Sequence, residues 1–152
     1  MKNELIKHLN VILRNELVAI NQYFLHAKIL EDKGFMKLAA IAKAESIDEM
    51  RHADTIIARI LFLKGVPKMT EYGNLRIGEN VEEILKNDLQ LEIDAISDLR
   101  NAIEAANKAS DSTSKTMLET ILASEENHFD FLETQLDLIK TLGLQNYLTT
   151  QV

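Results

Sequence analysis

The stretch Glu45-Ser46-Ile47-Asp48-Glu49-Met50-Arg51-His52 places a glutamate and a histidine, Glu49 and His52, three positions apart. Apolar residues recur at three- and four-residue steps on both sides of it, which is the period of one face of an α-helix. Residues at i and i+3 share a helical face, so both side chains are expected to point inward with the apolar ones. The stretch therefore predicts a buried helix with an unusually polar middle.

The same arrangement occurs a second time downstream. Glu125 and His128 form another Glu-x-x-His pair, and in each case a lone glutamate stands in an apolar stripe 33 residues before the glutamate of the pair, at Glu16 and at Glu92. A single Glu-x-x-His on a helix is most often an ordinary polar pair, and the lone glutamates could lie at the edges of their stripes. The duplication with equal spacing favours one shared site.

Composition limits the fold class and the kinds of partner. The 152 residues are enough for one domain, 1–152, and the single Pro, five Gly and 5% aromatic content indicate an all-α protein. The net charge of −7, without a cluster of Lys and Arg, disfavours nucleic acid and anionic membrane surfaces and favours cations. The chain has no Cys, which excludes disulfides and thiolate metal sites.

Targeting and membrane signals are also missing from the pattern. The first residues, Met1-Lys2-Asn3-Glu4-Leu5-Ile6-Lys7, alternate polar and apolar side chains and lack the apolar core of a signal peptide. No stretch approaches the roughly 18 apolar residues of a membrane span. We therefore expect a cytoplasmic protein.

Four long helices follow from the apolar periodicity. Gly34, Gly143 and the pair Gly65 and Pro67 mark helix ends, with a left-handed cap expected at Gly65. A turn at 110–114 precedes the last long helix. The predicted helices span about Leu5–Glu31, Phe35–Lys64, Val81–Lys108 and from the turn to Leu142.

The connections between these helices predict the topology. Two pairs have short loops, whereas 67–80 has no helical period and is long enough to cross the length of a bundle. The tail 144–152 can add a short fifth helix, and its apolar residues suggest oligomerisation. Together these features predict a four-helix bundle of ferritin-like connectivity, with a long crossover between the second and third helices.

In such a bundle the two halves are quasi-repeats, and a rough two-fold axis brings Glu16, Glu49, His52, Glu92, Glu125 and His128 to its middle. Four unpaired carboxylates in one dry core are costly, and two divalent metal ions would cancel their four charges while the imidazoles complete the coordination. This ligand set is that of di-iron and di-manganese carboxylate bundles. Oxygen and nitrogen ligands suit iron or manganese, and zinc could occupy the same atoms.

Five further residues have less certain roles. His8 and His26 lie off the ligand faces and are expected to be exposed to solvent. Tyr23 is either a core tyrosine or a hydrogen-bond donor or redox-active ring beside the metals, and Asp88 either orients a ligand histidine or is solvated. Met50 is rotated away from the metal face, so periodicity predicts a methionine at the surface or at an interface.

The chain resembles the bacterioferritins over nearly its whole length. The segments that carry this resemblance are Asn15–Ala27, Glu45–His52, Arg59–Leu63, Leu91–Glu92, Glu125–His128 and Gly143–Leu148. The resemblance implies a cage of 24 subunits, built from two-fold dimers, that oxidises Fe²⁺ with O₂ or H₂O₂ and stores the ferric mineral inside. The chain would then be a ferroxidase, either in a homo-oligomer or in a mixed cage with a related subunit.

The resemblance also implies roles for individual residues. Glu16 and His52 would hold one iron of each subunit and Glu92 and His128 the other, with Glu49 and Glu125 as bridging ligands. Met50 and its symmetry mate would supply the two axial thioethers of a haem b shared between two subunits. Electrons for iron release would come from a ferredoxin-type donor through the haem.

Two positions depart from the family pattern. An inner-surface iron site of the family uses a histidine where this chain has Ala44, although the aspartate of that site remains as Asp48. The chain has no Trp, and Phe131 occupies the position in the fourth helix where the family has one. Electron transfer through either feature is therefore put in doubt.

Three other interpretations fit parts of the pattern. A stand-alone di-iron oxidase or peroxidase of the rubrerythrin-like kind would use the same ligands, but the chain lacks rubredoxin-type cysteines and its apolar tail favours a cage. A haem subunit whose partner oxidises the iron would be expected to have a broken ligand set. A metal-free interaction bundle would gain no thermal stability from Fe²⁺.

Overall fold

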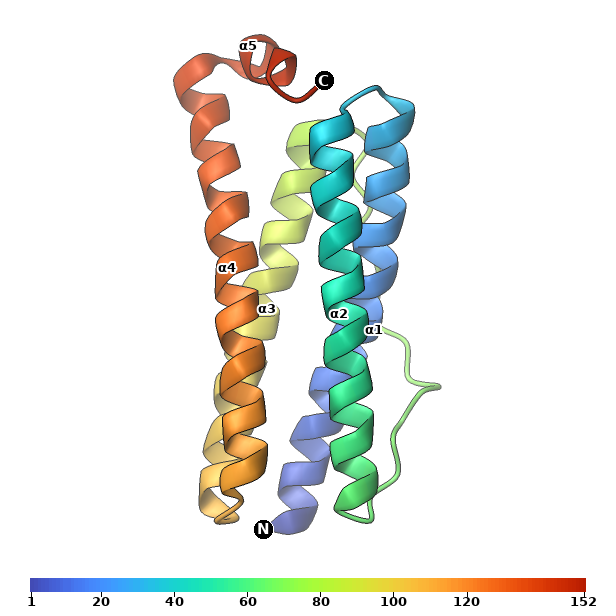
Figure 1. Ribbon diagram of the computed structural model, residues 1–152, viewed down its shortest axis with the longest axis vertical. Coiled ribbons are helices and arrows are strands. Elements are labelled where there is room, and N and C mark those ends of the chain that lie inside the picture. The colour runs from blue at the N-terminus through green and yellow to red at the C-terminus, as the bar shows by residue number, and fades with distance from the viewer.

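The computed structural model describes residues 1–152 and contains five helices (Figure 1). Their bounds are α1 Lys2–Asp32, α2 Met36–Phe62, α3 Val81–Lys108, α4 Ser112–Leu142 and α5 Leu144–Thr149. The predicted all-α class and short fifth helix are confirmed, and the predicted ends of the long helices fall within about three residues of the observed ones.

The four long helices form one bundle. In Figure 1, α1 runs upward, α2 and α3 both run downward, and α4 returns upward, with α5 lying across the upper end. α1 packs against α2 and α3, and α4 packs against α3 and α2. Since α2 and α3 are parallel, the segment 63–80 between them must climb the length of the bundle, as the ferritin-like connectivity requires.

The helix ends are only partly as predicted. Gly34, just past α1, has a φ of +91°, which is the left-handed conformation that glycine adopts without strain. At the end of α2 the left-handed residue is Lys64, with a φ of 65°, and Gly65 has no positive φ, so the cap predicted at Gly65 is wrong. Gly65 is needed for space instead, because a Cβ there would lie 2.9 Å from the side chain of Ile6.

The apolar core is divided into two clusters by a polar layer. The lower cluster contains 13 buried residues, among them Leu9, Ile56 and Leu99, and the upper cluster contains 11, among them Leu30 and Leu132. The inward-facing Glu and His residues of the long helices lie between the two clusters in sequence on every helix. Each cluster therefore fixes the helices on one side of the polar layer.

The crossover is fastened to α1 by three buried polar side chains. Asn10 donates to the carbonyl of Val66 at 3.1 Å and accepts from the amide of Lys68 at 2.9 Å. Gln22 accepts from the amide of Arg76 at 3.1 Å. Because these amides and carbonyls belong to a segment without regular structure, side chains of α1 supply the partners that a helix or a sheet would supply elsewhere.

The third of these residues is His26. The sequence predicts that it is exposed to solvent, and this prediction is wrong. Its side chain is fully buried, and its Nε2 accepts a hydrogen bond from the amide of Gly78 at 3.0 Å. The face of α1 that carries His26 is covered by the crossover, which helical periodicity does not reveal. His8, near the start of α1, is partly exposed.

The tail packs largely on its own bundle. Tyr147 of α5 is completely buried in the upper cluster, Leu148 packs against it, and the Tyr147 hydroxyl donates to Gln135 at 2.7 Å. Leu144 and Val152 remain exposed, at 38% and 68%, so the tail still leaves apolar surface uncovered, as the oligomerisation suggested by its sequence would require.

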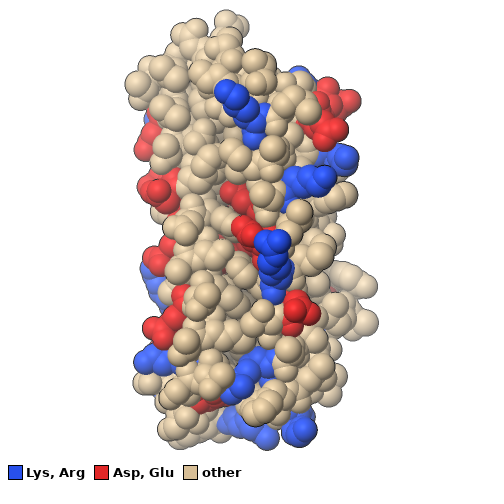
Figure 2. Space-filling view, viewed as in Figure 1, with Lys and Arg blue, Asp and Glu red and all other residues tan.

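The surface mixes charged and apolar groups. Figure 2 shows Lys, Arg, Asp and Glu side chains interspersed over one face, with no block of a single sign. Several large apolar side chains of α2 are exposed, including Met50, Leu61 and Phe62. None of the helices combines the length and the apolar character that a membrane span requires.

Asp111 joins the beginning of α4 to the end of α2. Its carboxylate accepts from the amide of Ser114 at 2.9 Å and from Arg59 at 2.8 Å. Burial raises the pKa of Asp111, but the hydrogen bonds from Ser114 and Arg59 outweigh it and lower that pKa below its ordinary value.

We expect Asp111→Ala to destabilise the protein by about 0.5–2 kcal/mol, the usual effect of losing an N-cap. Thermal unfolding at neutral pH measures it, with the exposed Asp130→Ala as control. Since the folded-state pKa of Asp111 is lowered, the difference should disappear in acid as the pH falls through that pKa. An Asp111→Ala variant as stable as Asp130→Ala at neutral pH would contradict this role.

Candidate metal centre

All six side chains singled out in the sequence meet in the polar layer between the two apolar clusters. Glu16 comes from α1, the pair Glu49 and His52 from α2, Glu92 from α3, and the pair Glu125 and His128 from α4. All four carboxylates are at most 1% exposed. The helical stripes that bury the apolar residues bury these glutamates with them, because the same period places both on the inward face.

The six side chains form two overlapping groups that could each hold a metal ion. In each group, one ligand atom per residue lies within 4.8 Å of all the others. The first group is Glu16, Glu49, His52 and Glu125, and the second is Glu49, Glu92, Glu125 and His128. Since Glu49 and Glu125 belong to both groups, they occupy the positions of bridging ligands between two ions.

Each imidazole presents Nδ1 to the carboxylates. His52 Nδ1 lies 3.1 Å from Glu125, 3.4 Å from Glu49 and 3.5 Å from Glu16. His128 Nδ1 lies 3.4 Å from Glu49, 3.6 Å from Glu92 and 4.0 Å from Glu125. These separations suit ion pairs, yet none of these contacts has the geometry of a hydrogen bond.

The buried polar atoms that lack a hydrogen-bond partner test whether a metal fits. There are seven such side-chain atoms in the protein, and all belong to the six residues of the two groups: Glu16 Oε2, Glu49 Oε1, His52 Nδ1, Glu92 Oε2, Glu125 Oε1 and Oε2, and His128 Nδ1. Leaving one such group without a partner costs about 1–3 kcal/mol or more. The convergence of all seven on one spot fits two metal ions that would accept their lone pairs.

Burial shifts the pKa of every one of these carboxyl groups upward. It raises the pKa of Glu16 and of Glu125 to about 7 and that of Glu49 to about 8, and it raises the pKa of Glu92 well above its ordinary value. Without a metal, the carboxyl groups therefore hold protons near neutral pH. Divalent ions would have to displace those protons.

The imidazoles shift in the same direction for a different reason. Burial by itself lowers the pKa of His52, but its contacts with Glu125, Glu16 and Glu49 outweigh burial and raise it to about 12. Burial likewise lowers the pKa of His128, and the contact with Glu92 and the charges around it raise the pKa to about 10. In the metal-free protein both imidazoles therefore carry the positive charge that metal ions would otherwise supply.

Tyr23 is both a core tyrosine and a hydrogen-bond donor to the cluster. Its ring is completely buried, and its hydroxyl donates a hydrogen bond of 2.5 Å to Glu92 Oε1. The ring also stands edge-on to the imidazole of His128, with centroids 6.2 Å apart. Tyr23 thus holds one carboxylate oxygen of Glu92 while the other remains without a partner.

Asp88 has neither of the roles considered for it. It is buried and accepts from Gln22 Nε2 at 2.9 Å and from His26 Nδ1 at 2.8 Å, both on α1. Since His26 Nε2 accepts from a backbone amide, the proton of this imidazole is on Nδ1. Asp88 therefore orients the histidine that fastens the crossover, and not a candidate ligand.

Two acids near the cluster were not assigned to it from the sequence. Glu45, one turn before Glu49, is buried, and burial raises its pKa to about 8. It belongs to neither of the two groups that could hold a metal ion. Asp48 is partly exposed, and its Oδ2 lies 3.4 Å from Nε2 of His128. Glu45 shares the helical face of Glu49, whereas Asp48 lies at the edge of that face, and only the packing of α4 against α2 shows that Asp48 reaches an imidazole.

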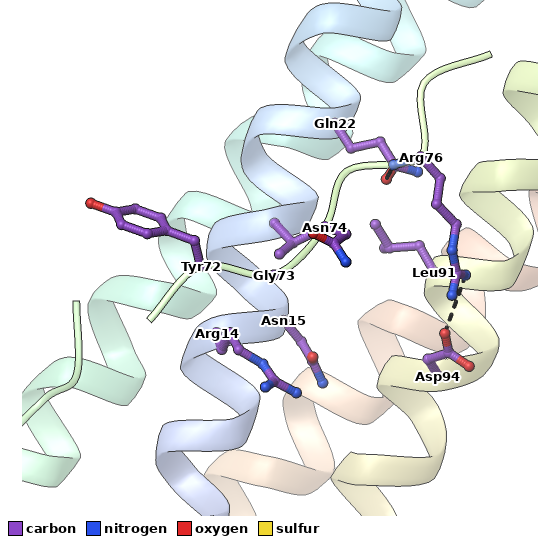
Figure 3. Close-up of a pocket in the computed structure, with 10 residues that line it drawn as sticks. Arg14, Asn15, Gln22, Tyr72, Gly73, Asn74, Arg76, Leu91 and Asp94 are labelled. Atoms are coloured by element: carbon purple, nitrogen blue, oxygen red, sulfur yellow. Dashed lines mark hydrogen bonds and ion pairs between the residues drawn. The ribbon is translucent and has the colours of Figure 1, made fainter. Parts of the chain in front are cut away.

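A surface cleft lies beside the two groups that could hold a metal ion and does not contain them. It has a volume of about 430 Å³ and lies between α1, α3 and the crossover, where Arg76 pairs with Asp94 at 3.4 Å (Figure 3). Its lining residues Asn15 and Leu91 each immediately precede a glutamate of the cluster. The candidate centre itself is enclosed within the bundle.

Comparisons with known proteins agree with the fold. The family model described as "Ferritin-like domain" matches residues 6–142. A protein named bacterioferritin from Streptomyces coelicolor is 49% identical over 149 residues, which cover 98% of this chain and 89% of that protein. The chain belongs to the bacterioferritin family. The family resemblance seen in the sequence is thus confirmed.

Other bacterioferritins are similar over the same length. The protein from Brucella melitensis is 46% identical over 97% of this chain and 92% of its own length. The protein named bacterioferritin BfrA from Mycobacterium tuberculosis strain H37Rv is 46% identical over 95% of this chain and 91% of its own length. The family model, over residues 6–142, spans the part of the chain that carries the six converging side chains.

We expect divalent metal binding to release about two protons from the imidazoles, in addition to those held by the carboxyl groups, because the ligands must be neutral imidazole and carboxylate. The affinity for Zn²⁺ should fall as the pH is lowered from about 8 through 7, the range in which the pKa values of Glu16, Glu49 and Glu125 lie. Calorimetric titration in buffers of different ionisation enthalpy measures the protons released. Zn²⁺ binding that releases no protons would contradict this charge balance.

Proposed function

We propose that the chain is an iron-storage protein with ferroxidase activity, in which the buried cluster binds two Fe²⁺ per subunit and oxidises them to Fe³⁺. One observation carries the proposal: every buried side-chain atom without a hydrogen-bond partner belongs to the six residues of this cluster. Membership of the bacterioferritin family supports iron as the metal, and oxygen and nitrogen ligands without thiolate suit iron.

Each residue of the cluster has a specific role in this proposal. Glu16 and His52 hold one Fe²⁺, and Glu92 and His128 hold the other. Glu49 and Glu125 bridge the two ions, which is supported by their membership of both metal-sized groups. Two divalent ions balance the four carboxylates, so the occupied centre is electrically neutral in a core that excludes water.

The iron is the substrate and supplies the electrons. Each Fe²⁺ gives up one electron, so two Fe²⁺ with O₂ and two protons yield two Fe³⁺ and H₂O₂, and two Fe²⁺ with H₂O₂ and two protons yield two Fe³⁺ and two water molecules. The protein holds both ions at once, so that the electron pair leaves in one event. Tyr23 fixes the orientation of Glu92 by its hydrogen bond, and the apolar clusters on both sides keep the helices at their spacing.

The proposal extends to the assembly and to a second cofactor. Twenty-four subunits, arranged as two-fold dimers in a homo-oligomer or in a mixed cage, enclose the ferric mineral in the cytoplasm. Met50 of each of two subunits would hold a haem b between them, and the bound haem would supply a route for electrons from a ferredoxin-type donor. The exposure of Met50, 56% on the outer side of α2, supports a role at an interface with another subunit.

The first test compares iron oxidation by wild type, His128→Ala and His8→Ala after anaerobic addition of two Fe²⁺ per chain followed by air. We expect His128→Ala to slow the fast phase, followed by absorbance, by at least about 10-fold, since losing even an outer-shell partner of a ligand has that effect. His8 lies outside the cluster and serves as the matched control. If His128→Ala oxidised iron as fast as His8→Ala, the di-iron assignment would be wrong.

The second test concerns the haem. We expect Met50→Leu to remove the Soret band of the purified protein while leaving the fast phase of Fe²⁺ oxidation unchanged, because Met50 faces away from the cluster. Met36→Leu, at another exposed methionine of α2, should keep the Soret band. A bis-thioether haem spectrum that survives in Met50→Leu excludes Met50 as the ligand.

A further inference from the structure

The two candidate histidine ligands, His52 on α2 and His128 on α4, differ in what lies on the side of the ring away from the cluster. Nδ1 of His128 faces the carboxylate cluster, and its Nε2 lies 3.4 Å from Asp48 Oδ2 on the neighbouring helix. The other oxygen of Asp48 is 3.2 Å from Arg51. Figure 2 shows acidic side chains midway along the seam between α2 and α4, where the two helices meet at the surface. His128 therefore stands between a buried set of carboxylates and a carboxylate at the surface.

His52 has no such partner. Its Nδ1 also faces the cluster, but its Nε2 makes no hydrogen bond or ion pair with any protein group. The two halves of the chain are related by an offset of 76 residues, which relates Glu49 to Glu125 and His52 to His128. The same offset relates Asp48 to Ser124, a residue that offers no charge. The quasi-two-fold symmetry of the centre is thus broken at this pair of positions.

This difference affects how well each imidazole is prepared to bind a metal ion. A metal on Nδ1 requires a neutral imidazole whose proton is on Nε2. A carboxylate that accepts a hydrogen bond from this N–H fixes the tautomer and the ring orientation and makes the ligand atom more basic. Losing such a partner typically lowers metal affinity 10–100-fold. Asp48 is placed to accept a hydrogen bond from Nε2–H of His128, whereas no carboxylate is placed to do the same for His52.

We propose that Asp48 is a positioning residue for His128, and that it makes the metal position of Glu92 and His128 bind divalent ions more tightly than the position of Glu16 and His52. The inference rests on the proposed di-metal centre and adds an order of filling to it. The first ion enters at Glu92 and His128, and the second completes the centre beside His52.

An ordinary surface role for Asp48 is the competing explanation. Its pair with Arg51 spans three residues on one helix and is exposed, and such pairs contribute about 0–1 kcal/mol. This role does not account for the contact with His128, which uses the oxygen that Arg51 does not touch. A surface role also predicts no effect of Asp48 on metal affinity, so the two explanations differ in a measurable quantity.

The test is an anaerobic titration of the assembled protein with Co²⁺, which binds like Fe²⁺ but is not oxidised by the centre, followed by calorimetry and by the visible absorption of bound cobalt. We expect wild type to bind two ions per chain in two unequal steps. Asp48→Ala should weaken the tighter step about 10–100-fold. Asp48→Asn keeps a hydrogen-bond acceptor without the charge and should give an intermediate constant, and it replaces Asp48→Ala if that variant does not assemble.

Two further variants locate the effect. Ser124→Asp should tighten the weaker step by giving His52 the partner that it lacks, and Arg51→Ala should leave both steps unchanged, since it removes only the surface pair. Equal steps in wild type, or Asp48→Ala and Asp48→Asn constants equal to those of wild type, would overturn the inference while leaving the di-metal centre intact. A wild-type protein that binds no Co²⁺ or Fe²⁺ would overturn the proposed centre together with the inference.

Discussion

The burial of four carboxylates in one dry layer is the constraint on which the rest of this protein depends. A carboxylate in such a place is either protonated or neutralised by a cation, and burial raises the pKa values of these groups accordingly. In the metal-free protein, two imidazoles with raised pKa values supply part of the compensation. The polar layer is therefore compatible with two charge arrangements, one with protons and one with two divalent ions, and the proposed iron-oxidising centre would exchange one for the other.

Apolar clusters on both sides of this layer stabilise the bundle around it. The lower and upper clusters each contain residues of all four long helices, so apolar packing holds the helices together above and below the layer. The hydrogen bonds of Tyr23 with Glu92 and of His26 and Gln22 with Asp88 join α1 to α3 at the level of the layer. Rigidity matters here because bridging ligands must stay within reach of two ions at once.

Helical periodicity and composition were sufficient to predict the fold and the side chains that converge. The apolar period is local, so it locates the helices and shows that Glu16 and Glu92 point inward, and the repeated spacing brings the two halves together. The residues that sequence reasoning misplaced all depend on contacts distant in the chain. His26 contacts Gly78 of the crossover and Asp88 of α3, and a Cβ at Gly65 would come within 2.9 Å of Ile6 at the start of α1. Asp48 on α2 contacts His128 on α4. This contact depends on how the two helices are rotated relative to each other, which the sequence pattern of either helix alone does not determine.

The single helix α2 serves two surfaces because consecutive residues of a helix differ by about 100° in direction. Glu49 lies in the buried cluster, whereas its neighbour Met50 points about 100° away from it and is exposed. A subunit that oxidises iron and also contacts a partner needs both faces, and one turn of α2 provides them without a loop or a second domain. Asp48 lies at the boundary between these faces, so the helix rotation that buries Glu49 and exposes Met50 also points the carboxylate of Asp48 along the seam toward His128. The orientation of α2 would therefore link the proposed metal centre, the exposed face of the helix and the proposed difference between the two metal positions.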